Sequence, residues 1–270
     1  MYFYLMKNYF YLSFALLLFS CGSNETKVGT PESAKAEAVK NLTEKVKQNP
    51  DSAVLRMRLI NSLDSLEQYS TAIKNVDSFL VKDSMNQGLW VTKAHLEESN
   101  KDTINAIKSY ERAIRIYPSL EAQLYLANLF AETKNPKALL LCTNVLKMGQ
   151  GRETDANCSF IAAVYFSRIG NTTKALEGFD KAIADNYTLI AAYLEKGFIY
   201  YDRKNFSTAL KIFETAQKVS ATNADVYYWI AKCNEQIGNK QEALLNFQRA
   251  LGLDKTLTDA KEGVERLSKN

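Results

Sequence analysis

The feature that most constrains the fold is a pattern that returns every 34 residues along the second half of the chain. It has three columns, two of small residues and one of aromatic residues between them: Ala175, Ala209 and Ala243; Phe179, Phe213 and Phe247; Ala182, Ala216 and Ala250. Spacings of four and three residues place the columns on one face of an α-helix. A single alanine–phenylalanine pair is typical of any core helix, but several columns at one period indicate an internal repeat.

Each of these segments is preceded by a second segment with its own small residue. Four small residues lie 12 positions before the alanine of the following segment: Ala94 before Ala106, Ala163 before Ala175, Gly197 before Ala209, and Ala231 before Ala243. Two antiparallel helices about 8–10 Å apart need small side chains where their axes come closest, and aromatic side chains such as Trp90 fill the space beside them. The pattern therefore predicts a helix–turn–helix unit. Its expected packing residues are Trp90, Ala94, Ala106, Ala175, Gly197, Ala209, Phe213, Ala231, Ala243 and Phe247.

The composition agrees with a helical array. The chain has only 11 glycines and 4 prolines in 270 residues. A β-sandwich or β-barrel needs a turn roughly every 8–12 residues, so these classes are disfavoured. The one histidine, His95, excludes metal motifs that need two histidines, and a net charge of +4 is too small to indicate a nucleic-acid partner. We expect no metal, no cofactor and no nucleic acid.

The grid resembles the tetratricopeptide repeat, a helix–turn–helix unit of 34 residues. This resemblance implies an all-α fold, an α-solenoid that follows a right-handed superhelix. We expect an array over 53–257 with about six units, at 53–86, 87–119, 120–155, 156–189, 190–223 and 224–257. Terminal repeats need a solvated face, so capping helices are expected at 33–52 and 258–270. The glycine-containing linker at 149–152 suggests a hinge between two halves of three repeats.

The N-terminus is predicted to be an export signal that ends at a cysteine. Residues 9–19 form an apolar run of about 11 residues, too short for a membrane span, and translation could start at Met1 or Met6. Leu18, Phe19, Ser20 and Cys21 resemble a bacterial lipobox, although a small residue is commoner where Phe19 stands. The resemblance implies cleavage of residues 1–20 and acylation of Cys21, with 21–32 as a flexible tether. The alternative is an ordinary signal peptide that happens to be followed by Cys21.

Three further cysteines allow at most one disulfide. Cys142 and Cys158 could lie near each other in the fold. The alternative is that these two residues and Cys233 serve as small buried hydrophobic side chains.

The resemblance also implies a binding surface, because the first helices of tetratricopeptide arrays line a groove for peptides or partner segments. Its columns correspond here to Asn61, His95, Asn128, Phe160, Phe198, Tyr201 and Tyr228. The two asparagine amides could hydrogen-bond a ligand backbone, and the aromatic residues suggest an apolar or extended segment. Each aromatic residue could instead pack between repeats, and His95 could be a surface residue without a role. Met57, Val91 and Leu124 stand where a carboxylate-binding site would carry lysine, which argues against recognition of a C-terminal carboxylate.

These observations favour a bacterial tetratricopeptide lipoprotein that is not an enzyme. The sequence has no G-x-S-x-G motif, no paired Cys-x-x-Cys and no P-loop. We expect a scaffold or adaptor that binds a protein segment in its groove and supports an envelope assembly or secretion complex. Its expected location is the bacterial cell envelope, where the lipid would anchor it in the outer membrane facing the periplasm; the alternative is the outer side of the inner membrane. The alternative is a glycan-binding or enzymatic envelope protein that uses the aromatic groove and His95.

Overall fold

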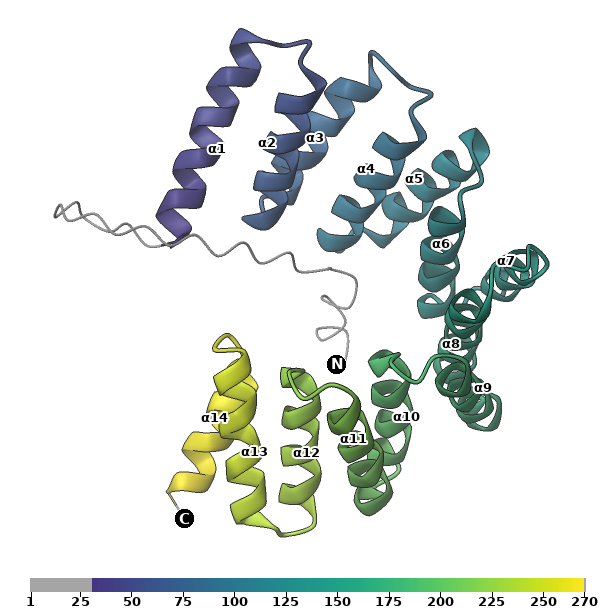
Figure 1. Ribbon diagram of the computed structural model, residues 1–270, viewed down its shortest axis with the longest axis vertical. Helices are drawn as coiled ribbons and strands as arrows, with labels where there is room; N and C mark the ends of the chain where they lie inside the picture. Colours follow the sequence, from purple (N-terminus) through teal and green to yellow (C-terminus); the bar gives the residue numbers. More distant parts are fainter. Residues whose placement is uncertain (1–30, 270) are drawn as a thin grey trace, which may run out of the picture. The chain divides into compact units, whose positions relative to one another are not determined.

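The computed structural model describes residues 31–269, and these residues form fourteen α-helices and no strand (Figure 1). The helices are α1 (Pro31–Gln48), α2 (Ala53–Ser65), α3 (Tyr69–Leu80), α4 (Gln87–Ser99), α5 (Thr103–Ile116), α6 (Leu120–Glu132), α7 (Lys137–Leu146), α8 (Arg152–Arg168), α9 (Thr172–Asp185), α10 (Ile190–Asp202), α11 (Phe206–Val219), α12 (Ala224–Gln236), α13 (Lys240–Leu253) and α14 (Thr258–Ser268). The predicted all-α fold is confirmed. The expected signal peptide and Cys21 lie outside the described residues, as does the tether apart from its last two residues, where α1 begins. No helix in the described part of the chain is both long and apolar enough to cross a membrane.

The chain divides into two compact units, which we call the first unit (residues 31–122) and the second unit (residues 123–269). In the first unit each helix from α1 to α5 packs against the next, and in the second unit the same holds from α7 to α14 (Figure 1). We call α2, α4, α6, α8, α10 and α12 the first helices, and α3, α5, α7, α9, α11 and α13 the second helices. The expected hinge at 149–152 is wrong, because α7 and α8 pack against each other across that linker while the division falls within α6.

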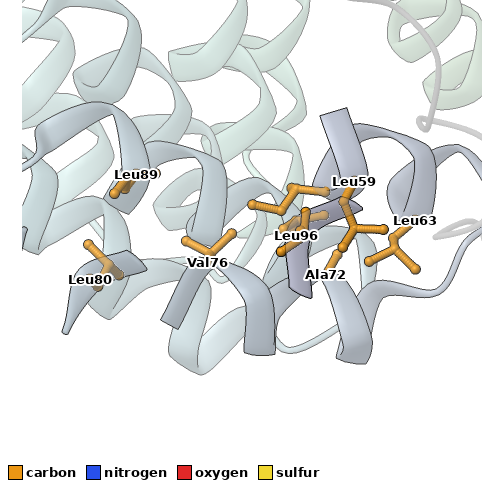
Figure 2. Packing of buried hydrophobic residues seen from close by; sticks show 9 residues of the cluster. Leu59, Leu63, Ala72, Val76, Leu80, Leu89 and Leu96 are labelled. Atoms are coloured by element: carbon orange, nitrogen blue, oxygen red, sulfur yellow. The ribbon is translucent and has the colours of Figure 1, made fainter. Parts of the chain in front are cut away.

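The core of the first unit is aliphatic. Figure 2 shows Leu59 and Leu63 of α2 gathered in one cluster with Ala72 and Val76 of α3 and Leu96 of α4. Ile60, which stands where the repeat pattern has a small residue, is 1% exposed and belongs to the same cluster. Ala72 of α3 is also in this cluster, so a larger residue on one helix is accommodated beside a small residue on the next.

The core of the second unit is built from alanine and phenylalanine columns. Phe179, Phe213 and Phe247 are fully buried, as are the alanines four residues before each of them. At Gly197 an added Cβ would lie 2.3 Å from the Phe213 ring. No real Cβ fits at that distance, so the glycine lets α10 approach the aromatic column of α11.

The turns inside the repeats share one backbone conformation. Each turn has one residue with positive φ: Glu67, Lys101, Lys134, Gly170, Lys204 and Gly238. In every turn the next residue donates its backbone N–H to a carbonyl five positions earlier, for example Gln68 to Leu63 and Asn239 to Asn234. This arrangement closes the end of the preceding helix. Four of the six turns achieve it without glycine, which helps to explain how a chain with few glycines can make six tight turns.

Candidate partner-binding surface

The candidate binding residues all lie on first helices, but they fall in different units and different environments. Their positions are Asn61 on α2, His95 on α4, Asn128 on α6, Phe160 on α8, Phe198 and Tyr201 on α10, and Tyr228 on α12. Asn61 is exposed, whereas Asn128, Phe198 and Tyr201 are half-buried. Only the residues from Asn128 onward lie in the second unit.

His95 is bound to a neighbouring helix. Its Nδ1 lies 2.8 Å from the hydroxyl of Tyr110 on α5, and the two rings meet edge to face with centroids 5.5 Å apart. Tyr110 is fully buried and occupies the column that holds Phe179, Phe213 and Phe247 in later repeats. A buried hydroxyl needs a hydrogen-bond partner, and His95 provides one. Burial lowers the pKa of His95 to about 4, so the ring is neutral at pH 7. His95 therefore has a structural role inside the repeat.

Phe160 and Tyr228 are packed between helices. Phe160 is 7% exposed and lies 5.8 Å, centroid to centroid, from Phe179 of α9. Tyr228 is 8% exposed and lies at the same distance from Phe247 of α13. Burial raises the pKa of Tyr228 above its ordinary value. The expectation that this pair faces a groove is corrected, because their position in the first helix points toward the second helix of the same repeat.

Phe198 and Tyr201 belong to a cluster that joins two first helices. Trp229 of α12 lies 4.6 Å from Phe198 and 5.2 Å from Tyr201, measured between ring centroids. Trp229 itself is 3% exposed. We call these three residues the aromatic cluster. Sequence reasoning missed Trp229, although a tryptophan one position before the aliphatic–small pair Ile230–Ala231 could have drawn attention to it.

A half-buried arginine joins three consecutive first helices in the second unit. Arg168 of α8 donates from Nε and Nη2 to both carboxylate oxygens of Glu132 on α6, at 2.8 and 3.0 Å. It also donates from Nη1 and Nη2 to Glu195 on α10, both at 2.9 Å. Burial disfavours its charge, but the hydrogen bonds to Glu195 and Glu132 outweigh this and raise the pKa of Arg168. The carboxylates of Glu132 and Glu195 thus share one cation, and removal of Arg168 would leave both without a partner.

A similar pair continues the row of first helices at the end of the chain. Arg266 of α14 donates from Nε and Nη2 to the two carboxylate oxygens of Glu235 on α12, at 2.8 and 2.9 Å. Arg168 therefore connects α6, α8 and α10, the aromatic cluster connects α10 and α12, and Arg266 connects α12 to the C-terminal helix α14. Sequence reasoning did not identify this set of links, because the partners are 27 to 36 positions apart and share no local motif.

The possible metal ligands and the cysteine thiols of the described residues are also predicted from the sequence to have no catalytic role. Within residues 31–269 no group of three or more His, Cys, Asp or Glu side chains could hold a metal ion. Cys142, Cys158 and Cys233 are free and buried. Burial raises the pKa of Cys233 to about 12, which keeps it in the unreactive thiol form.

Comparison with known proteins identifies the repeat. Family models described as "Tetratricopeptide repeat" match residues 88–120 and 194–257. Tetratricopeptide repeat protein 1 of Schizosaccharomyces pombe is 25% identical over 239 residues, which cover 81% of this chain and 22% of that protein. The chain spans about a quarter of the length of the curated relatives it matches.

Solved structures agree on the fold. A tetratricopeptide repeat protein from Parabacteroides merdae ATCC 43184 aligns with a TM-score of 0.69 and 18% identity, over 88% of this chain and 94% of that one. PilW, described as a widely conserved type IV pilus biogenesis factor, aligns with a TM-score of 0.60 and 16% identity, over 80% of this chain and 99% of that one. At this level of identity the similarity concerns the fold alone.

Proposed function

The chain is a tetratricopeptide-repeat protein, and on that premise we propose that it is a non-enzymatic scaffold, lipid-anchored in the bacterial envelope, that holds an extended segment of a partner protein. Tetratricopeptide-repeat proteins are typically scaffolds for protein–protein interaction. The observation that carries the proposal is the linked row of first helices in the second unit, with Phe198 and Tyr201 half-buried in it.

The links favour binding because they fix the surface in advance. Bidentate arginine–glutamate pairs hold α6, α8 and α10 together at one end of the row and α12 and α14 at the other. A partner that docks on a preorganised surface loses less free energy to ordering than one that must first fix loose side chains. The solvent-facing parts of Phe198 and Tyr201 then supply apolar contact area, which is typical of binding hot spots.

The envelope location rests on the N-terminal sequence. Acylated Cys21 would hold the chain at a bilayer, and the nine residues from Gly22 to Thr30, which precede α1, would reach about 30 Å when fully extended. Cys21→Ala should move the protein from the membrane fraction to the soluble fraction. Unchanged membrane association would contradict the anchor without touching the binding proposal.

The binding proposal is tested by co-purification from solubilised envelopes. Tyr201→Ala should lose the partner that the wild-type chain retains. Tyr187→Ala is the matched control, because Tyr187 is 69% exposed and lies in the connection between α9 and α10 rather than in a first helix. Equal retention by both variants would contradict binding at Tyr201. The alternative of an enzyme or glycan-binding protein that uses His95 has less support, because that side chain is engaged with Tyr110.

A further inference from the structure

The second unit has two edges with different charge, formed by its two kinds of connection between helices. The turn edge consists of the turns inside the repeats and the first three residues of each second helix. It carries six cations and one anion: Lys134, Lys137, Lys174, Arg203, Lys204 and Lys240, with Glu242. The opposite edge, taken in the same way from the connections between repeats, carries three cations and four anions: Lys147, Arg152 and Lys255, with Glu153, Asp225, Asp254 and Asp259.

The six cations of the turn edge face solvent and are not neutralised within the described part of the chain. All six are exposed, and none takes part in an ion pair among residues 31–269. Two further exposed anions border the edge: Asp202 next to Arg203, and Glu177 three positions after Lys174 on α9. With Glu242, three anions stand against six cations, so the edge remains positive.

The backbone does not require lysine at this edge. Lys134 and Lys204 have φ values of 60° and 59°, in the same turn position that Gly170 and Gly238 occupy. Glycine adopts this conformation without steric cost, whereas lysine does not. The lysines therefore add charge at positions where the turn alone would favour glycine.

Two of the six cations make cation–π contacts with aromatic rings near the turns. The Nζ of Lys137 lies 5.6 Å from the centroid of Phe130, and the Nζ of Lys174 lies 5.1 Å from that of Phe166. Both rings belong to first helices, so these ammonium groups lie beside the helix ends that border the turns. The six cations are distributed over four successive turns, which suits an extended anionic surface better than a single phosphate group.

We propose that the turn edge of the second unit binds the surface of an anionic phospholipid bilayer. The proposal rests on the proposed membrane anchor, which would keep the chain within reach of a bilayer, and on charge complementarity between six unneutralised cations and anionic headgroups. Because the edge lies at the ends of the helices, docking would stand the helices of the second unit upright on the membrane. The row of first helices would then face sideways, open to a partner.

The same turns of the first unit lack this property. Taken in the same way, they carry Glu67, Lys101 and Asp102, a net negative edge. The positive edge is therefore specific to the second unit rather than a general property of the repeat. Glu67 has a φ of 57°, which shows that glutamate is accepted at the turn position of Lys134 and Lys204.

The test is vesicle sedimentation with the full chain carrying Cys21→Ala, so that no acyl group contributes. Phosphatidylcholine vesicles with about one-third phosphatidylglycerol should bind this protein, and pure phosphatidylcholine vesicles should not. The triple variant Lys134→Glu, Arg203→Glu and Lys204→Glu should bind the anionic vesicles roughly a hundredfold more weakly, since each basic residue at an anionic surface contributes on the order of fivefold.

The control variant makes the same change in net charge on the opposite edge: Lys147→Glu, Arg152→Glu and Lys255→Glu. It should bind within about twofold of the parent, because only charges within a Debye length of the headgroups contribute. Thermal melts followed by circular dichroism check that both variants fold. Equal loss in both variants, no loss in either, or equal binding to neutral vesicles would overturn the proposal. Failure of the Cys21→Ala fractionation test would remove the anchor alone, since the vesicle assay does not use it.

Discussion

The two units build the same helical hairpin from different interior side chains. The first unit buries aliphatic residues such as Leu59 and Val76, and the second unit buries the phenylalanine column of Phe179, Phe213 and Phe247. Where the first unit pairs His95 with Tyr110, the second unit, three repeats later, pairs Phe198 with Phe213 at a centroid distance of 5.9 Å. The helical hairpin thus accepts either a hydrogen-bonded polar pair or an apolar one at the same two positions.

The two units differ more in their charged contacts than in their interior side chains. Both share a lysine–aspartate pair between a first helix and the preceding second helix, Lys93 with Asp77 and Lys196 with Asp180. Within the described residues, only the second unit has bidentate arginine–glutamate pairs, which connect α6, α8 and α10 to one another and α12 to α14. The common pairs therefore belong to the repeat itself, whereas the links along the first helices and the positive turn edge are specific to the second unit.

The largest effect is expected from removing the central cation of that row. Arg168→Met leaves Glu132 and Glu195 without their partner, which should lower the free energy of unfolding of the second unit by about 3–5 kcal/mol. The two tryptophans report the units separately in urea titrations, because Trp90 lies in the first unit and Trp229 in the second. The midpoint reported by Trp229 should fall while that of Trp90 stays within error. Adding Glu132→Gln and Glu195→Gln should restore much of the loss; no restoration would refute the ionic explanation.

A smaller effect is expected at the close contact between α10 and α11. Gly197→Ala places a Cβ against the Phe213 ring and should cost about 1–3 kcal/mol, because the ring must shift in a packed core. Gly252 is the matched control, since a Cβ there meets nothing within 4 Å. Gly252→Ala should be neutral or slightly stabilising in a helix. If the Trp229 midpoint did not change in Gly197→Ala, the small-residue column would not limit the approach of the helices.

The smallest effect, taken over a single pH unit, is a pH dependence of the stability of the first unit. His95 has a folded pKa of about 4 against 6.5 for the free group, so below pH 6.5 the unfolded chain binds a proton that the folded chain does not. Stability should therefore fall as the pH drops from about 6.5 toward 4, by at most about 1.4 kcal/mol per pH unit. Burial raises the pKa of Glu97 in the same unit, which acts in the opposite direction.

The comparison between units supplies the variant that isolates His95. His95→Phe with Tyr110→Phe copies the Phe198–Phe213 pair and keeps Glu97 unchanged. The difference between wild type and this double variant, followed through Trp90, should grow as the pH falls below about 6.5. A difference that is constant with pH would mean that His95 is solvated in the folded chain.

The repeat could be predicted from the sequence because each column contains one kind of residue at a constant spacing of 34 positions. The columns of Ala209 and Phe213 predict which side of each helix is buried, and burial of both residues is observed. The flanks of the buried face were harder to assign. Phe160 and Tyr228 were expected in the groove but are buried, and periodicity alone does not fix which residues at the border of the apolar stripe face solvent.

The links between first helices could not be predicted for a different reason. Arg168 reaches Glu132 and Glu195 only because the three helices are placed side by side, and no sequence spacing encodes that placement. The aromatic cluster likewise depends on the position of Trp229 relative to α10. Local patterns determine the hairpin, whereas contacts between repeats require the stacked structure.

The central claim is that the row of first helices in the second unit holds the partner. Site-specific photo-crosslinking in intact envelopes tests it directly. A benzophenone side chain is placed at Asn128 or Tyr201 in the row, at Asn61 in the first unit, and at Tyr187 in the connection between α9 and α10. Asn128 and Tyr201 are predicted to crosslink to one common protein, and Asn61 and Tyr187 to none. Crosslinks from Asn61 or Tyr187 that match or exceed those from Tyr201 would contradict this account.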